Sequence, residues 1–392
     1  MAHTRTSSTA ISEATPRIFM PTWREFNREI FNTGLYEAQD VLADMGAVDL
    51  CALMPRRGLR FKEKWQRLLL YRDPTDRLMF ANPGLEPVRL DDEYEAFVVF
   101  CQSFRDLLYV NAVQGWQERC RTSVCWIDEI WAAVVPRYKN WLKVLRPFEH
   151  ICVSSQKSAK VLSEAIGRPC HWVPGGVDAL RFSPYPNSPR RVVDVYSVGR
   201  RWDGIHNALL ELAARKSLFY VHDTVQGIST MPPINGRQHR DLYASVAKRS
   251  RYFVVAPAKM DDPDHTKGES ELGYRYFEGA ASGAVMIGQS VDGEHYRELF
   301  GWPDAVISIR SDGADVAEVL ADLDANPARA AAIGRRNAAE ALLRHDWVYR
   351  WKKIWELAGI PLSPGMIARE ATLGRLAAGV IADVGEGRSV HA

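Results

Sequence analysis

Short apolar segments alternate with helical patterns along most of this chain. They lie at 17–21, 48–54, 95–101, 123–128, 150–155 and 170–175, and again at 192–199, 218–224, 252–257, 284–288 and 305–309. Apolar runs of this length are typical of strands buried on both faces, and helical patterns between them indicate parallel sheets. The doubled pattern predicts two α/β domains of the nucleotide-binding type that face a cleft.

Composition changes divide the chain further. Residues 1–16 are rich in Ser, Thr and Ala, so we predict that they are disordered. Three prolines within 180–191 predict a linker. The Rossmann-like domains are therefore expected at 17–179 and 192–345, followed by an amphipathic helix at 346–360 and a tail at 361–392.

Charge and cysteine usage exclude several classes of protein. Lys and Arg number 50 against 48 Asp and Glu, and no basic block occurs, so we expect no nucleic-acid partner. The N-terminus lacks the apolar core of a secretory signal and no run approaches a membrane span, which predicts a cytoplasmic protein. The six cysteines form no CxxC pair, so neither zinc nor a redox site is indicated.

The segment 271–288 carries the strongest chemical signal. A polar stretch and small residues end at Gly283, and an apolar run follows, which predicts a helix and then a buried strand. On such a helix Glu271, Arg275 and Glu278 share one face. Two carboxylates and a guanidinium at a helix N-terminus suit a ligand with hydroxyls and phosphate. A solvent-exposed salt-bridge ladder has the same spacing.

This segment resembles the donor-binding motif of retaining, two-domain (GT-B) glycosyltransferases of the group 1 type. In that motif an acid, a short helix and Glu-x-x-Ala-x-Gly precede a buried strand, and Glu278, Ala281 and Gly283 match the second part. The position of the upstream acid is Ser270, with Glu269 and Glu271 on either side, so either glutamate is a candidate. The run 275–278 also resembles the Arg-x-Phe-Glu of a divergent branch.

Two further elements carry the resemblance. Gly199, Arg200 and Arg201 follow an apolar run, like the family's strand–Gly–Arg element, although Asp203 stands where a lysine is usual. The run 173–184 resembles the family's Pro-Asn-Gly-Val-Asp…Phe-x-Pro junction between domains, with glycine in place of asparagine. Arginine suits this place because it binds phosphate oxygens through two donors and keeps its charge.

The resemblance implies a GT-B enzyme whose helix at 346–360 crosses back to the first domain. It implies that Glu278 binds the ribose hydroxyls of a nucleotide sugar and that Arg200 and Arg275 stabilise the departing diphosphate. Glu271 or Glu269 would hold sugar hydroxyls. Gly199, Arg201 and Ser270 are the remaining candidates for donor binding in these motifs. His222 is a further donor-binding candidate because it follows an apolar run at the same sheet edge, although a structural role also explains it. Transfer would retain the anomeric configuration with no cofactor, no metal and no protein nucleophile.

The first domain would hold the acceptor, which we expect to be a glycan, a lipid-linked sugar or a small molecule, with peripheral membrane contact as a further option. Asp128 and Glu129 end an apolar run and are candidates for binding acceptor hydroxyls, although a helix N-cap explains Asp128 equally well. Ile127 replaces the histidine that many relatives carry.

Two alternatives stay open. The absent lysine and histidine are compatible with a non-catalytic GT-B scaffold that binds a nucleotide sugar or a partner. Asp262 and Asp264, separated by a proline, have the spacing of an Asp-x-Asp metal motif and are compatible with a metal-dependent transferase.

Overall fold

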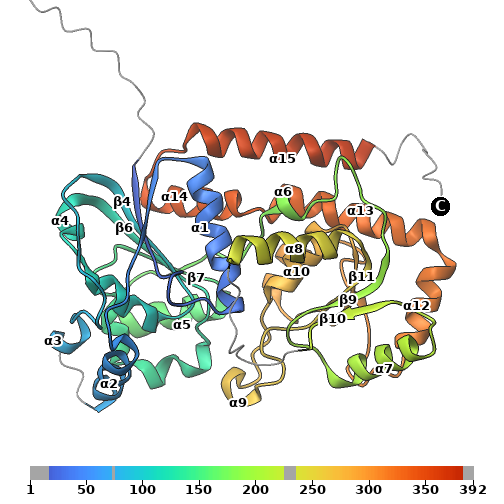
Figure 1. Cartoon of the computed structure of the whole chain (residues 1–392), viewed down its shortest axis with the longest axis horizontal. Coiled ribbons are helices and arrows are strands. Elements are labelled where there is room, and N and C mark those ends of the chain that lie inside the picture. Colours follow the sequence, from blue (N-terminus) through green and yellow to red (C-terminus); the bar gives the residue numbers. More distant parts are fainter. Residues whose placement is uncertain (1–16, 73–75, 225–234, 383–392) are drawn as a thin grey trace, which may run out of the picture.

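The computed structural model describes residues 17–72, 76–224 and 235–382. Two parallel sheets form the centres of two domains that lie side by side (Figure 1). The first sheet has the order β2-β1-β4-β6-β7-β8. Its strands are β1 (Ile18–Thr22), β2 (Val48–Ala52), β4 (Tyr94–Cys101), β6 (Cys120–Ile127), β7 (His150–Val153) and β8 (His171–Trp172). A separate two-stranded pair joins β3 (Val88–Arg89) to β5 (Val113–Gln114).

The second sheet has the order β10-β9-β11-β12-β13. Its strands are β9 (Val193–Ser197), β10 (Tyr220–His222), β11 (Ser250–Val255), β12 (Val285–Gly288) and β13 (Ile307–Ser308). Neighbouring strands pair in parallel in both sheets. Each apolar run of the sequence overlaps one of these strands, and the predicted fold class is confirmed. The carboxyl ends of the strands in each sheet meet at one edge, where ligands of such folds bind.

Helices cover both sheets. In the first domain they are α1 (Thr33–Met45), α2 (Leu59–Arg72), α3 (Asp76–Met79), α4 (Trp116–Arg119) and α5 (Gln156–Ile166), with 3-10 helices at Ile30–Asn32, Phe104–Ala112, Ala132–Tyr138 and Trp141–Leu145. In the second they are α6 (Ala179–Phe182), α7 (Asp203–Ala214), α8 (Gly236–Lys248), α9 (Pro263–Thr266), α10 (Tyr274–Ala281), α11 (Glu294–Phe300), α12 (Val316–Ala325) and α13 (Pro327–Arg344).

The helix α14 (Trp347–Ala358) crosses back to the first domain, as the resemblance implied. Its buried Trp351 lies 4.6 Å from the ring of Phe100 on β4, and its indole donates to the carbonyl of Ala38 on α1 at 3.1 Å. Phe100 stacks in turn on Trp126 of β6 at 4.2 Å. Large aromatic side chains bury much apolar surface, so this cluster is a major part of what holds the two domains together.

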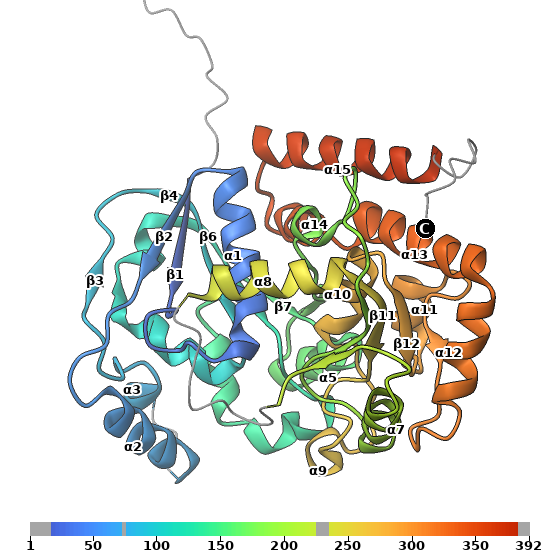
Figure 2. The ribbon, with the colours of Figure 1, turned by 45° about the vertical axis from the view of Figure 1, so that its right-hand side comes forward.

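Much of the segment predicted as a tail is a packed helix, α15 (Pro364–Ala382), while residues 383–392 lie outside the described part, as do residues 1–16. Figures 1 and 2 both place α15 along the upper side of the molecule. Arg369 of α15 donates to Asp178 at 2.6 Å and to Asp346 at 2.7 Å. Between 17 and 382, outside the two gaps, no helix is long and apolar enough to cross a membrane.

Candidate functional site

Glu278 lies at the centre of a buried group of charges. Its carboxylate accepts hydrogen bonds from the Tyr243 hydroxyl at 2.6 Å, from Arg275 at 2.7 Å and from Arg240. Its side chain is fully buried. Burial by itself favours the neutral acid, but Arg275 and Arg240 outweigh it and hold the pKa of Glu278 at about 2. The carboxylate is therefore charged over the whole physiological range.

Arg240 continues this group into the first domain. It lies on α8 and donates to both carboxylate oxygens of Glu37 on α1, at 2.8 and 2.9 Å. Glu37, Arg240, Glu278 and Arg275 thus form one chain of alternating charges, called here the charge network. Figures 1 and 2 both show α8 beside α1. Its two carboxylates balance its two guanidinium groups, which is the condition under which buried charges are tolerated.

The structure corrects the interpretation of 271–288 in two respects. The helix begins at Tyr274, so Glu271 precedes it and only Arg275 and Glu278 share its face. A solvent-exposed ladder is also wrong, because Glu278 is buried. The predicted contact between Glu278 and ribose stays a prediction. Because the side chain is fully buried, a ribose hydroxyl could reach this carboxylate only if the surrounding side chains moved.

The turn after β9 holds Arg275 in place. Gly199 has φ +76° and its N–H donates to Asp223 at 2.9 Å. Arg275 donates to the carbonyl of Val198 at 3.0 Å. A Cβ on Gly199 would lie 2.9 Å from the guanidinium of Arg275. Glycine is therefore required twice, for its backbone conformation and for the close approach of this side chain.

Asp223 contacts two other residues predicted at this sheet edge, Arg201 and His222. Buried Arg201 forms an ion pair with its carboxylate and donates to its carbonyl at 2.7 Å. His222 lies 3.1 Å from the same carbonyl. Arg200 instead turns outward, with 48% of its side chain exposed, and forms an ion pair with Asp261. Of the two arginines of the Gly–Arg element, only Arg200 is accessible to a ligand.

We expect Gly199→Ala to disturb donor binding, with Gly167→Ala as a matched control. Gly167 has φ +70° but open space around its Cβ position, so both variants share a backbone cost of about 1–2 kcal/mol. Only Gly199→Ala displaces Arg275. Calorimetric titration with a nucleoside diphosphate should show weaker binding for Gly199→Ala alone. Equal affinities in the two variants would contradict this role of the turn.

The two candidate acids upstream of α10 both contact the first domain. Glu269 accepts the backbone N–H groups of Ala132 and Ala133, at 3.1 and 2.6 Å, at the start of a 3-10 helix. Glu271 accepts the hydroxyl of Ser155 at 2.6 Å and lies 3.7 Å from His295. Ser270 stands between them in the sequence. Their predicted role with sugar hydroxyls stays a prediction, and each acid now joins the two domains.

The predicted acceptor residues face the second domain. Asp128 accepts the hydroxyl of Tyr274 from α10 at 3.0 Å. Glu129 forms an ion pair with Lys259 and accepts the Trp131 indole N–H at 3.2 Å. The alternative role of Asp128 as a helix N-cap is wrong, because the following 3-10 helix has Trp131 at that position. Asp128 and Glu129 therefore lie opposite donor-side residues.

A cavity of about 170 Å³ lies beside Glu129, between the two domains. Trp131, Tyr138 and Phe104 of the first domain line it, together with Lys259 and His265 of the second. Aromatic faces and charged groups in one cavity suit a ligand with both apolar ring faces and hydroxyls.

Two interdomain carboxyls hold their protons unusually firmly. Burial raises the pKa of Asp128 to about 7, with a further rise from neighbouring Glu129. Burial also raises the pKa of Glu271 to about 7. Solvated carboxyls release their protons near pH 4. Between about pH 4 and 7 the packed domains therefore bind more protons than separated or unfolded domains do.

Ionisation of Asp128 and Glu271 should lower stability as pH rises from about 5 to 8, because their charged forms favour the solvated states. Histidines whose pKa burial lowers, such as His345, act in the opposite direction up to about pH 6.5. Thermal unfolding of Asp128→Asn with Glu271→Gln should therefore lose the falling contribution, so that the variant gains stability relative to the unchanged protein as pH rises through this range. An unchanged slope of stability against pH in that double variant would assign the pH dependence to other groups.

The proposed Asp-x-Asp motif is not assembled as a site in this structure. Asp262 caps α9 by accepting the N–H of His265 at 3.2 Å. Asp264 is exposed and pairs with Lys267 at 3.1 Å. In the part of the chain that the structure describes, no group of three or more His, Cys, Asp or Glu side chains is placed to hold a metal ion.

Several residues of the site carry no signal in the sequence. Glu37, Tyr243 and Ser155 stand in ordinary helical or N-cap patterns, and only the fold brings them to Arg240, Glu278 and Glu271. Arg240 does not directly follow an apolar run, where ligand-binding residues were expected, and it belongs to no recognised motif.

Comparison with known proteins places this site in context. Residues 187–356 match the family described as glycosyl transferase-like. An alpha-glucosyltransferase (AGT) in complex with UDP is 11% identical with a TM-score of 0.55, over 88% of this chain and 100% of that chain. The Anabaena protein HepE in complex with UDP-glucose is 11% identical with a TM-score of 0.51, over 88% and 99%.

Another structure of the alpha-glucosyltransferase, with UDP and a 13-mer DNA containing an HMU base, is 12% identical with a TM-score of 0.55, over 88% and 100%. No curated protein matches the sequence. The shared fold confirms the predicted two-domain architecture, and the sequence match over 187–356 supports the predicted glycosyltransferase assignment. Residues 187–356 are thus similar to a glycosyl transferase-like family, and the chain has the two-domain GT-B fold found in glycosyltransferases.

Proposed function

We propose that this protein transfers a hexose-like unit from a UDP-sugar to an acceptor hydroxyl, with retention and without a metal ion. The observation that carries the proposal is the arrangement at the end of β9. There a glycine turn, exposed Arg200 and the guanidinium of Arg275 meet within the glycosyl transferase-like domain. The similar solved structures contain UDP or UDP-glucose, which supports uracil as the base of the donor nucleotide.

Two arginines suit the charge that develops on a departing diphosphate. Arg200 is exposed and can leave Asp261 for a phosphate oxygen, because exposed ion pairs are weak. Arg275 is held by Val198 and Glu278, so its guanidinium needs little reorganisation when charge develops. In this proposal Glu278 first positions Arg275, and it binds ribose only if the side chains that bury it move aside.

The acceptor side is formed by the first domain. Asp128 and Glu129 would orient the acceptor hydroxyl, and the aromatic cavity beside Glu129 would hold its ring. The bond from the anomeric carbon to phosphate breaks while the bond to the acceptor oxygen forms on the same face. The hydroxyl proton passes to the departing phosphate oxygen. No protein nucleophile is then needed, and Glu271 or Glu269 would hold the sugar.

The experiment is a panel of UDP-sugars, measured first by thermal shift and then by release of UDP. Binding raises the melting temperature by mass action. The matching donor should also be hydrolysed slowly, with the same rate in EDTA. NMR of the product with an acceptor should show a retained anomeric configuration. An inverted product, or loss of activity in EDTA, would overturn the corresponding part of the proposal.

The main alternative is a non-catalytic scaffold. It predicts a thermal shift with a UDP-sugar but no release of UDP under any condition. The acceptor class also needs its own test, because a protein of similar fold binds DNA with an HMU base. Our expectation that nucleic acid is not a partner is checked by including DNA among the acceptors.

A further inference from the structure

The helix α2 exposes a row of large apolar side chains. Phe61, Trp65, Leu68 and Leu69 are 68%, 49%, 42% and 44% exposed. Their spacing of four, seven and eight residues places them on one face of the helix. Leu59, Gln66 and Leu70 on the opposite face are buried. The rings of Phe61 and Trp65 contact each other, with centroids 6.0 Å apart, so the exposed row is continuous.

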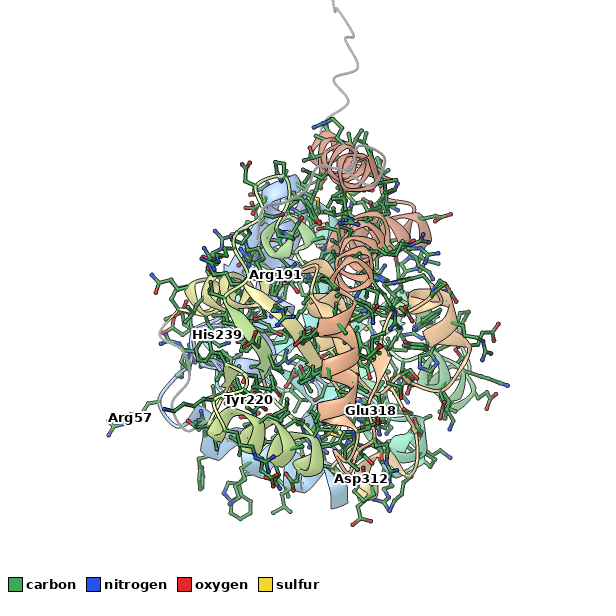
Figure 3. All side chains as sticks on the ribbon, turned by 90° about the vertical axis from the view of Figure 1, so that its right-hand side faces the viewer. Arg57, Arg191, Tyr220, His239, Asp312 and Glu318 are labelled. Carbon is green, nitrogen blue, oxygen red and sulfur yellow. The ribbon has the colours of Figure 1, made fainter. Side chains whose placement is uncertain are left out.

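Positive charge surrounds this row. Although no unbroken basic block occurs in the sequence, residues 54–70 contain six cations and one acid, whereas the whole chain has a net charge of only +2. Five of these cations, Arg56, Arg57, Arg60, Lys62 and Lys64, are exposed. Figure 3 shows Arg57 extending away from the body of the protein. The acid, Glu63, turns inward, where it pairs with Arg67 and accepts the Tyr109 hydroxyl at 2.6 Å.

We propose that this face of α2 docks on an anionic lipid bilayer. Apolar aromatic side chains flanked by lysine and arginine match the boundary between acyl chains and negatively charged headgroups. Four apolar side chains on one helix are too few for a stable protein interface, which buries about 800 Å² on each partner. A protein partner would need a surface of complementary shape. A fluid bilayer does not, because its headgroups can rearrange around flexible cations and its acyl region can accept a small apolar row.

The position of α2 gives the docking a consequence. It follows β2 and so lies beyond the carboxyl end of the first sheet, the same edge at which β6 presents Asp128 and Glu129. Both views place α2 at the lower side of the molecule, away from α15 (Figures 1 and 2). A docked protein therefore turns its acceptor edge toward the bilayer. The docking itself does not rest on the proposed transfer reaction.

The test is co-sedimentation of the full chain with phosphatidylcholine vesicles, with and without phosphatidylglycerol. We expect binding only when phosphatidylglycerol is present, and weaker binding in high salt. Trp65→Ser with Leu68→Ser should weaken it on the order of tenfold or more. Lys62→Glu with Lys64→Glu should weaken it by at least about fivefold for each charge removed.

Ile367→Ser with Arg375→Glu on α15 is the matched control, because both residues are exposed but lie on the opposite side. It should bind vesicles like the unchanged protein. Equal binding by the α2 variants, or equal loss in the control, would overturn the proposal. So would gel filtration showing that α2 joins two copies of the chain while vesicles are not bound. All variants should keep UDP-sugar hydrolysis in solution, which separates this test from that of the proposed function.

Discussion

Arg240→Ala should destabilise the protein by about 3–5 kcal/mol, the largest effect we expect from one polar substitution. Arg240 donates to Glu37 on α1 and to Glu278 on α10, and all three side chains are buried. Its removal leaves two carboxylates in the interior without part of the positive charge and the hydrogen-bond donors that stabilise them. Chemical denaturation followed by circular dichroism measures the change in free energy of unfolding.

Arg237 provides a matched control on the same helix. It also pairs with a carboxylate of α1, Asp40, at 3.0 Å, but its side chain is half exposed. We therefore expect Arg237→Ala to cost less than about 1 kcal/mol. Arg240→Lys keeps a charge but cannot reach both carboxylates through a planar fork, so its stability should fall between the two. Equal losses in the free energy of unfolding for Arg237→Ala and Arg240→Ala would show that burial of the charge network does not determine the cost of removing an arginine.

Arg200→Ala should lower kcat by about 10²–10³-fold while leaving KM for the donor and stability almost unchanged. Within the proposed function, Arg200 acts mainly on charge that develops as the diphosphate departs, and loss of one such group typically costs this much. The stability cost is small because its ion pair with Asp261 is exposed. Initial rates of UDP release with the matching donor, together with a melting curve, measure both quantities.

Two variants sharpen this test. Arg200→Lys keeps the positive charge and should recover part of the rate. Arg215→Ala removes an exposed arginine at the far end of α7, where it pairs weakly with Glu211 at 3.9 Å, and should leave the rate unchanged. Full activity in Arg200→Ala would contradict the assignment of this residue to the departing diphosphate.

Features that depend on near neighbours in the chain could be predicted. The strands are continuous apolar runs because parallel sheets are buried on both faces, so the strands can be recognised from the sequence alone. The end of α10 before Gly283 and the turn at Gly199 depend on backbone freedom at one residue. The motif around Glu278 also depends on short spacing, and the pair that it forms with Arg275 is three residues apart.

The start of α10 could not be placed in the same way. Polar residues continue from Glu271 through Arg275, so periodicity alone extends the helix too far. The structure begins it at Tyr274 because Ser155 and the 3-10 helix at Ala132 draw Glu271 and Glu269 toward the first domain. These contacts join residues more than a hundred positions apart, and no local pattern encodes them.

The sequence by itself determined the two α/β domains, the glycine turn, the arginines beside it and the acids at the end of β6. Only the tertiary structure decided which charges meet. Glu37 and Arg240 are 203 positions apart, and they pair because α14 and its tryptophans bring the two domains together around them. A charged side chain has no intrinsic preference for one distant partner, so its burial and its role follow from packing that is settled by apolar surfaces.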